Sequence, residues 1–502
     1  MKVNIKLLIY PVIATALFSA CDDFLDKEPL SQPSSEIFWK TETDVNAALA
    51  ATYSIYRTNI AGSVAGSNGV SINIECLSDN AISESGFFGI QNIMHGGIHS
   101  GTGGAVQDFW RLCYEGIANC NYFLDNIDQA KDFLSEESYN QYKGEALFNR
   151  CYFYNELIQL YGDVPLLLHS QSIDSMEVFK NKPRVPKPEV VEQLLKDIDI
   201  AISGLPNIAY TDGHAVKGSA ILLKVRILMN NERWAEAAEV AWSLIGDAGN
   251  PFSLHDNYSG IFFDEQEDNP EIMFSVQYQL PSDGHQLDQY IGSRMSFYPT
   301  TQLRDAYEIK DPETGEMDPR LGMTIFQEGD PWIMHPSGKF PAFENDEGRT
   351  SEGNVNFTGM AFKKWVNPTL IQARDKVSDQ DIVKMRYAEL LLSYAEAMFE
   401  SGQGTDQRAL DAINAVRQRP GVEMPPLSVL TRENIRNERR IELAFEGLRF
   451  NDLKRWQIAH EIIPEIPGNG ADVQRVFDGY LWPIPQSQMD IMEGIWEQNP
   501  GF

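Results

Sequence analysis

The chain has 502 residues and a formal net charge of −31, with 41 Lys and Arg against 72 Asp and Glu. This length is ample for a large hydrophobic core and allows more than one lobe. Nucleic-acid binding needs clustered Lys and Arg, so the acidic composition argues against a nucleic-acid partner. It argues less strongly against anionic substrates, because a local basic pocket can persist on an acidic protein.

Residues 1–20 have the pattern of a secretory signal peptide. Lys2 and Lys6 provide a positive start, and an apolar stretch follows at 7–18. A membrane-spanning helix needs about 20 apolar residues, so this stretch is too short for a permanent anchor. We therefore expect residues 1–20 to be removed on export.

The motif "LFSAC" (17–21) resembles the bacterial lipobox, in which the cysteine is acylated and becomes the mature N-terminus. We expect lipidation at Cys21, since acyl chains hold a protein on a membrane. The alternative is an ordinary cleavage site beside a chance cysteine. Residues 21–43 contain acids, prolines and serines, which predicts an extended tether.

Helical periodicity dominates residues 44–249, which we expect to form an N-terminal helical scaffold. Apolar residues recur at helical spacing in three segments, namely 44–57, 106–127 and 138–162. Three stretches also place small residues among large ones, namely 143–168, 217–245 and 385–419. A helix, a short turn and a second helix with Ala at the close contacts resemble a tetratricopeptide (TPR) unit. Ordinary antiparallel helix hairpins are the alternative.

The character of the chain changes at 250–381, where Gly, Pro, Asn and Asp interrupt it and aromatic residues are dense. Long irregular segments are uncommon in compact domains and tend to carry function. We predict a loop-rich ligand-binding lobe with short strands, inserted before a C-terminal helical scaffold at 382–502. In that scaffold, 432–456 interleaves Arg and Glu with an apolar stripe, which predicts a helix with surface i,i+4 ion pairs. The predicted fold class is mainly α, with a TPR-like helix-pair scaffold.

Besides Cys21, the chain has Cys76, Cys113, Cys120 and Cys151, and none forms a CxxC pair. An oxidising compartment permits a disulfide, but the spacing does not define its pairing. The last three lie in helical patterns, which favours small buried apolar residues over a disulfide.

Several motifs together resemble the SusD/RagB family of nutrient-binding outer-membrane lipoproteins. They are "CDDFLDKEP", "FWKTETDVNAALAATY", "GEALFNRCYFYNELIQLYGDVPLLL", "DPRLGMTI", "FKKWVNP", "VKMRYAELLLSYAEAMFE", "AINAVRQRPGV", "ERRIELAFEGLRFNDLKRW" and "YLWPIPQSQMDI". They cover most of the chain outside the loop-rich region 250–375. The segments "ELAFEGLRFNDLKRW" and "WPIPQSQMDI" are specific to the family, whereas TPR-like helices alone are not.

The resemblance implies a non-enzymatic protein on the outer membrane, lipid-anchored and facing the cell exterior. Members of this family capture oligosaccharides, or peptides in the RagB branch, and pass them to a SusC-like TonB-dependent transporter. Their TPR-like helices face the transporter, and the loop-rich side holds the ligand. The acids after Cys21 then resemble a signal for export to the cell surface. Cys151, Pro420 and Phe502 are mild departures from the family pattern.

Candidate catalytic motifs are weak. The segment "GGIHSG" (96–101) lacks the glycine two positions before Ser100 that G-x-S-x-G requires. Glu442 and Glu446 lie one helical turn apart, but arginines surround them, which favours a structural ion-pair ladder over a glycosidase pair. We therefore predict no enzyme activity.

Metal-binding patterns are weak as well. His95 and His99 have a spacing that suits zinc on a helix, but the glycines between them predict a loop. The segment 264–271 is acidic enough for calcium but matches no EF-hand spacing, which favours a solvated loop. No cofactor is predicted.

Sugar binding needs aromatic rings that stack on the C–H face of a pyranose, with planar polar side chains beside them. The candidate ligand contacts lie at the start of the helix predicted near 106, in a chain break before it and in the loop-rich lobe. They are Asp79, Asn80, Trp110, Arg111, Tyr298 and Trp332. Taken singly, each of these residues is explained more readily by packing in the core or in a loop. As a group they are favoured by the resemblance, because the ligand site of the family is built from this helix start and the loop-rich lobe. Two other interpretations stay open. A RagB-type peptide-binding lid would have a deep mixed groove, and a TPR-like scaffold without a small ligand would bury the aromatics of 250–380.

Overall fold

The computed structural model describes residues 38–57, 74–83, 89–171, 180–263, 265–281, 283–285, 287, 297–327, 330, 357–366, 378–468 and 474–502. Within these ranges helices predominate and strands are short, so the predicted mainly α fold is confirmed. No helix in the same ranges is both long enough and apolar enough to cross a bilayer. The predicted signal peptide, Cys21 and Trp332 lie outside them.

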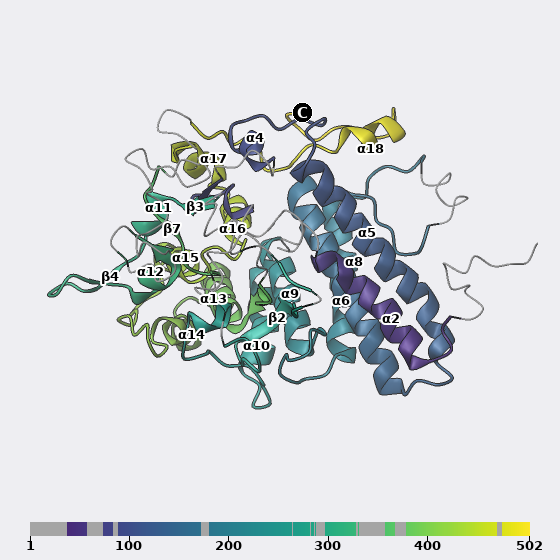
Figure 1. Cartoon of the computed structure of the whole chain (residues 1–502), viewed down its shortest axis with the longest axis horizontal. Helices are drawn as coiled ribbons and strands as arrows, with labels where there is room; N and C mark the ends of the chain where they lie inside the picture. Colours follow the sequence, from purple (N-terminus) through teal and green to yellow (C-terminus); the bar gives the residue numbers. More distant parts are fainter. Residues whose placement is uncertain are drawn as a thin grey trace, which may run out of the picture.

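The scaffold consists of stacked helix pairs, which run side by side through the right and centre of Figure 1. The pairs are α2 (Glu42–Tyr53) with α5 (Ala105–Asn126), α6 (Glu136–Tyr161) with α8 (Lys187–Gly204), α9 (Lys217–Met229) with α10 (Trp234–Ile245), and α13 (Tyr387–Met398) with α14 (Gln407–Arg417). Successive pairs also touch, α5 on α6, α8 on α9 and α10 on α13. Each pair therefore covers an apolar face of the next, as in TPR arrays.

The first of the three predicted TPR-like units is corrected. Helix α6 begins at the cap Ser135, whose hydroxyl accepts the N–H of Ser138 at 3.0 Å, and ends at Gly162. Gly162 has a φ of 71°, a left-handed conformation that favours glycine, and no helix follows it in 163–168. The partner of α6 is the more distant α8, so the pairing is less local than the sequence pattern suggested.

Small residues allow the scaffold helices to approach closely. A Cβ added at Gly116 of α5 would lie only 2.5 Å from Cε2 of Phe153 on α6. On α10, Ala237, Ala238 and Ala241 are all buried. These positions match the small residues that the sequence pattern placed among large ones, and they set the spacing of the helices.

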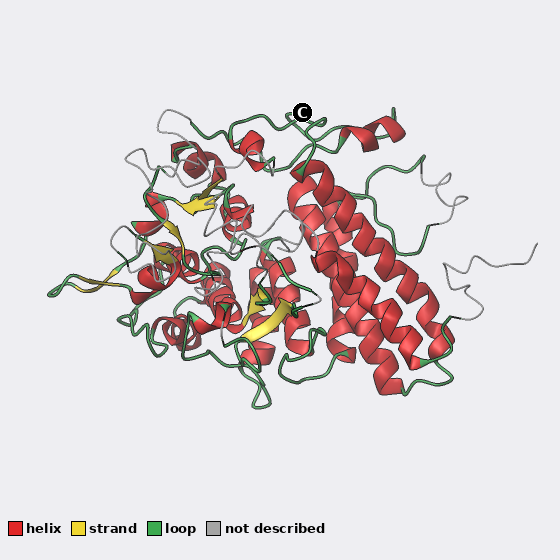
Figure 2. Ribbon diagram, in the orientation of Figure 1, coloured by secondary structure: helices red, strands yellow, loops and turns green. Residues whose placement is uncertain are grey.

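The loop-rich lobe contains short antiparallel strand pairs (Figure 2). The pairs are β1 (Ala81–Ser83) with β3 (Phe297–Pro299), β2 (Ile272–Val276) with β8 (Ile382–Arg386), β4 (Ile309–Asp311) with β5 (Glu316–Met317), and β6 (Ile325–Phe326) with β7 (Ala361–Phe362). Short helices accompany them, namely α4 (Ile90–Met94), α11 (Thr301–Arg304) and α12 (Pro319–Thr324). Strands β1 and β8 come from outside 250–381, so the lobe is joined to both flanking parts by backbone hydrogen bonds.

The C-terminal part forms α15 (Arg432–Glu442), α16 (Arg449–Arg455), α17 (Ala459–Ile462) and α18 (Gln486–Ile491). The single helix predicted for 432–456 is therefore wrong. The chain turns between α15 and α16, where Phe445 and Gly447 have φ values of 66° and 78°. The apolar stripe still packs inward, since Ile435, Ile441 and Phe445 are buried.

The cysteine prediction is borne out for the helical positions. Cys113, Cys120 and Cys151 are fully buried free thiols, and so is Cys76. Burial raises the pKa of all four thiols, which opposes thiolate formation.

Candidate ligand-binding site

A buried charge cluster joins the loop-rich lobe to the C-terminal helices. Arg386, the last residue of β8, donates hydrogen bonds to Glu442 at 2.6 Å, to Glu446 at 2.7 Å and to Glu271 at 2.8 Å. Arg419 donates to Glu442 at 2.6 Å, and Arg320 of α12 donates to it at 2.9 Å. All of these side chains are buried, so the cluster cross-links the lobe to the scaffold away from solvent.

Two glutamates of this cluster, Glu442 and Glu446, are held as anions. Burial alone raises the pKa of Glu442, but the charges of Arg419, Arg386 and Arg320 outweigh it and hold that pKa well below its usual range. Glu446, which also accepts a hydrogen bond from Lys364 at 2.6 Å, has a lowered pKa for the same reasons. Such a pair has no proton to donate at neutral pH, which agrees with the structural role that the sequence predicted.

Three of the six predicted ligand contacts come together where β1 meets β3. Tyr298 lies opposite Ile82 in the strand register, and the N–H of Thr300 donates to the carbonyl of Asn80 at 3.0 Å. The Asp79 carboxylate, beside Asn80, accepts two hydrogen bonds from Arg449, at 2.8 and 3.0 Å. The structure therefore brings these three residues together at the β1–β3 junction.

The exposure expected of these three residues is corrected, however. Asp79 is 3% exposed, and Asn80 and Tyr298 are fully buried. The Asn80 amide donates to Glu75 at 2.6 Å, and its oxygen accepts from Arg440 at 2.8 Å. Because their polar groups already have protein partners, Asp79 and Asn80 support the β1–β3 junction from within, and they do not form an open binding surface.

The other predicted contacts are separated from this junction or lie outside the described ranges. Trp110 is 4% exposed, and its ring packs against Tyr161 and Trp496, with ring centroids 5.0 and 6.3 Å apart. Arg111, the next residue of α5, is exposed and pairs with Glu115 at 3.1 Å. Only Arg111 of this pair is available to a ligand.

Most aromatic residues of the lobe that the structure describes belong to the core. Buried members of the aromatic-rich region 250–381 include Phe252, Tyr258, Tyr278, Phe297, Tyr298 and Trp365. Phe357 is 49% exposed, and Tyr290, Trp332, Phe340 and Phe343 lie outside the described ranges. The described aromatics therefore do not form a stacking platform on this lobe.

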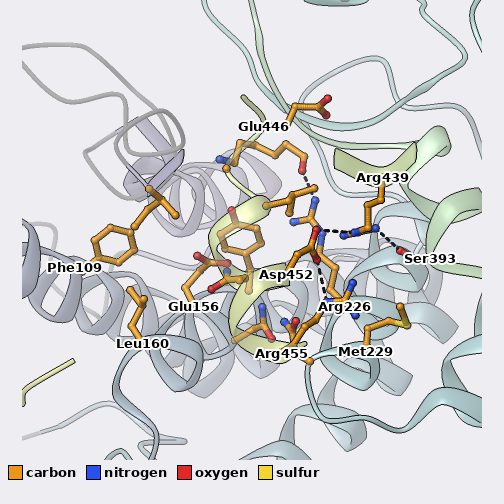
Figure 3. A pocket seen from close by; sticks show the side chains of 18 residues that line it. Phe109, Glu156, Leu160, Arg226, Met229, Ser393, Arg439, Glu446, Asp452 and Arg455 are labelled. Atoms are coloured by element: carbon orange, nitrogen blue, oxygen red, sulfur yellow. Dashed lines mark hydrogen bonds and ion pairs between the residues drawn. The ribbon is translucent and has the colours of Figure 1, made fainter. Parts of the chain in front are cut away.

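A polar cavity in the interior is unsuited to a saccharide (Figure 3). Helices α5, α6, α9, α13, α15 and α16 contribute to its wall, and Arg439 of α15 donates to Ser393 at 3.1 Å and to Asp452 at 2.8 Å. Its volume is about 60 Å³, far below the about 300–1,000 Å³ of ligand pockets. Burial raises the pKa of Glu156 in its wall. The cavity is large enough for ordered water only.

An open cleft of about 360 Å³ lies where the end of α2, the turn before α9 and the end of β2 meet. We call it the Tyr53 cleft; it is lined by Tyr53, Arg57, Asp212, His214 and Gln277. A partly exposed tyrosine ring, a guanidinium, an amide and a carboxylate are the groups that a saccharide uses. This site is not apparent from the sequence, because its three segments are far apart along the chain. The segment "YTDGHAV" (210–216) does indicate a polar turn.

A hydrogen-bond network fixes the wall of the Tyr53 cleft. The Tyr53 hydroxyl donates to Glu145 at 2.7 Å, and the same carboxylate lies 2.7 Å from Nδ1 of His214. The rings of Tyr53 and His214 meet edge to face at 5.8 Å. The hydrogen bond to Glu145 raises the pKa of His214. Both rings are therefore held in place before any ligand binds.

No candidate metal site emerges from the described residues, which contain no group of three or more His, Cys, Asp and Glu placed to hold an ion. His95 follows α4 and His99 lies in the exposed loop after it. In the acidic segment 264–271, Glu265 accepts a hydrogen bond from Asn257, and Glu271 is part of the buried charge cluster.

Comparisons with known proteins give matches along almost the whole chain. The family model described as the SusD family matches residues 259–502, and the model described as "Starch-binding associating with outer membrane" matches residues 23–226. SusD-like protein P2 of Formosa agariphila is 26% identical, over 96% of this chain and 97% of that protein. The starch-binding protein SusD of Bacteroides thetaiotaomicron is 24% identical, over 78% of this chain and 77% of that protein.

The fold is also found among solved structures. A SusD-like carbohydrate binding protein from Bacteroides fragilis superposes with a TM-score of 0.77 and is 26% identical. The superposition covers 90% of this chain and 99% of that protein. The similarity therefore includes both the helical scaffold and the lobe.

Proposed function

This chain is a member of the SusD/RagB family, and on that premise we propose that it captures an oligosaccharide or polysaccharide at the cell surface and delivers it to a SusC-like TonB-dependent transporter. The observation that carries the proposal is the superposition, over nine tenths of the chain, on a SusD-like carbohydrate binding protein. The starch-binding relative supports the same class of ligand. In this proposal the scaffold helices face the transporter.

The membrane anchor is part of the proposal. Cys21 follows a signal-like segment, and acyl chains on it would hold the body at the outer membrane. Cells that make the Cys21→Ala chain are expected to release it from the membrane fraction and to incorporate no labelled fatty acid into it. Retention of the variant on the membrane would contradict lipid anchoring at this residue.

The Tyr53 cleft is our candidate for the saccharide site. Its volume of about 360 Å³ lies within the range of ligand pockets. Its wall is ordered by the Tyr53–Glu145–His214 network, so little conformational freedom is lost on binding. Asp212 and Gln277 line it and can accept and donate hydrogen bonds to sugar hydroxyls.

The test is binding of the body, residues 22–502, to a panel of neutral and acidic polysaccharides by retardation in native gels. Retardation by a polysaccharide supports the function, and loss of retardation in Gln277→Ala and Asp212→Ala supports the site. Arg304→Ala is the control, because Arg304 is surface-exposed and pairs only with its neighbour Asp305 among the described residues. Retention of a peptide library in place of every glycan would favour a RagB-type lid, and retention of neither would favour a scaffold without a small ligand.

The transporter is tested separately. Affinity purification of the tagged full-length chain from solubilised outer membranes is expected to co-purify a SusC-like TonB-dependent transporter, identified by mass spectrometry. Recovery of the chain without any such transporter, even after cross-linking in intact cells, would contradict the delivery step while leaving glycan capture intact.

A further inference from the structure

A second open space lies on the scaffold, between the start of α8, the turn from α9 to α10, and the end of α16. We call it the α8–α16 groove. Its volume is about 520 Å³, which suits a sugar-sized ligand. The residues that matter below are Gln159, Lys187, Arg233, Lys454, Arg455 and Tyr480.

The side-chain amine of Lys454 has no anionic partner among the described residues. Its side chain is buried, and within the described ranges its hydrogen-bond acceptor is the carbonyl of Gln159 at 2.6 Å. No described carboxylate lies within ion-pair distance of it, whereas a buried lysine is normally paired. Burial and, after it, the nearby charge of Lys187 lower the pKa of Lys454 to about 7. The described residues thus give this amine one backbone carbonyl and no carboxylate as partner.

Two more polar side chains line the same space. The side chain of Gln159 is 9% exposed, and its Nε2 has no hydrogen-bond partner among the described residues. Lys187, the first residue of α8, also lines the groove, and the described residues give its ammonium no ion pair. Burial lowers the pKa of Lys187, while Asp163 and Glu232 raise it. An unpartnered amide N–H and two ammonium groups form a set of donors that fits an oxyanion.

The other charged residues of the groove are already paired. Arg455 is bound by Glu396 and Asp452, at 2.6 and 2.9 Å. Arg233 is bound by Glu192 and Glu236, at 2.6 and 2.5 Å. Each of these arginines is matched by two carboxylates, and the remaining acid on the rim, Glu232, is exposed to solvent. Among the cations that line the groove, Lys454 and Lys187 are therefore the two without an ion pair to any described residue, on a chain whose net charge is −31.

A further feature favours a ligand that carries both a sugar ring and an anionic group. Tyr480 lines the groove and is partly exposed, and its hydroxyl lies 2.6 Å from Nδ1 of His460, which restrains the ring. An aromatic ring beside cationic donors offers a stacking face for the sugar and ion pairing for its substituent.

We propose that the α8–α16 groove binds the anionic substituent of an acidic glycan, a uronate carboxylate or a sulfate ester, with Lys454, Lys187 and the Gln159 amide as donors. This inference rests on the proposed glycan-binding function and narrows its ligand class. It departs from the expectation from net charge, because Lys454 and Lys187 have no carboxylate partner among the described residues.

The experiment uses matched polymers and the body of the protein, residues 22–502. Dextran sulfate is compared with dextran, and polygalacturonate with its methyl ester, by native-gel retardation and calorimetry. We expect an anionic member to bind about tenfold or more tightly than its neutral counterpart, as charged hydrogen bonds imply. Equal affinity for both members of each pair overturns the inference but leaves neutral-glycan capture standing. Binding to no polymer overturns both proposals, and binding to poly-glutamate alone assigns the groove to acidic peptides and overturns the glycan assignment.

Variants locate the site. Lys454→Met keeps the apolar stem and removes the charge, and we expect it to abolish the preference for the anionic polymer. Lys196→Met is the control, because Lys196 is an exposed residue of α8, the helix that carries Lys187, and does not line the groove. Lys187→Met, at a less buried position, provides a second test if Lys454→Met does not fold. An unchanged preference in a folded groove variant overturns the assignment of the site.

Discussion

Asp79 and Arg449 form a doubly hydrogen-bonded ion pair, although 370 positions separate them in the sequence. Burial raises the pKa of Asp79, but the charges of Arg449 and Arg440 prevail and lower it to about 2. The carboxylate is therefore ionised at neutral pH. This pair connects the segment before β1 to α16 and places the β1–β3 junction on the C-terminal helices.

Replacing Asp79 tests whether this pair is structural. Asp79→Asn keeps the shape of the side chain but leaves the buried Arg449 and the partly buried Arg440 without this anion, which is expected to cost about 3–5 kcal/mol of unfolding free energy. Guanidinium denaturation at pH 7 measures the loss. Asp108→Asn is the control, because it removes an exposed partner of Arg111 at 3.5 Å and should cost about 1 kcal/mol or less. A stable Asp79→Asn protein that no longer bound glycan would restore Asp79 as a ligand contact.

The close contact between α5 and α6 predicts a glycine that alanine cannot replace. In Gly116→Ala the new methyl group would meet Phe153 at 2.5 Å, and overpacking of this kind costs about 1–3 kcal/mol. In Gly322→Ala on α12, no atom lies within 4 Å of the added Cβ. That control is expected to be neutral or stabilising, by up to about 1 kcal/mol, since alanine is the better helix former. Equal effects of the two substitutions on the midpoint of chemical unfolding would show that α5 and α6 are less tightly packed than described.

The His214–Glu145 contact predicts a pH dependence of stability. The pKa of His214 is raised above its ordinary value by the hydrogen bond to Glu145, so the folded protein binds this proton more tightly than the unfolded chain does. The stabilisation is thus fully present below about pH 6.5 and is lost as the pH rises through the raised pKa. The difference in unfolding midpoint between wild type and His214→Gln should therefore shrink with rising pH.

A control fixes the interpretation of this titration. His99→Gln removes an exposed imidazole in the loop after α4 and should leave the pH profile of the wild type unchanged. A difference between wild type and His214→Gln that stays constant from about pH 5.5 to about pH 8.5 would show that the contact acts by shape and not by charge.

The buried thiols predict slow chemistry in the native state. Burial raises the pKa of Cys120 to about 12 and raises that of Cys76, Cys113 and Cys151 as well. Ellman's reagent, which needs a thiolate and access to it, should leave the folded body of residues 22–502 unmodified and titrate these cysteines after denaturation in guanidinium. Rapid labelling of any one of them in the native protein would contradict its burial.

Local patterns in the sequence were sufficient for the scaffold. The helix predicted at 106–127 is α5, and the pair predicted at 217–245 is α9 with α10. These elements could be predicted because their apolar periodicity is clear and their packing partners are near in sequence. The same reasoning failed at 432–456. Its charges were assigned to surface pairs, but Glu438 accepts a buried hydrogen bond from Arg320, 118 positions away. No local pattern reveals such a partner.

The candidate sites show the same limit. Polar residues in a chain break, such as Asp79 and Asn80, resemble exposed contacts until their distant arginines are known. The Tyr53 cleft and the α8–α16 groove are each assembled from segments that are remote in sequence. Lys454, in the helix predicted to carry surface ion pairs, is marked as unusual only by its burial and its lack of a described counter-ion.

The contacts of segment 74–83 also constrain the order in which the protein is made. Glu75 accepts the N–H groups of Phe445 and Gly447, and Arg475 donates to the carbonyls of Cys76, Ser78 and Ala81. A nascent chain that has grown to residue 430 lacks all of these partners. Its early helices can pair as they emerge, but the β1–β3 junction must wait for the last stretch of synthesis. Completion of the lobe is thus expected near the end of synthesis, after residues 445–475 have been made.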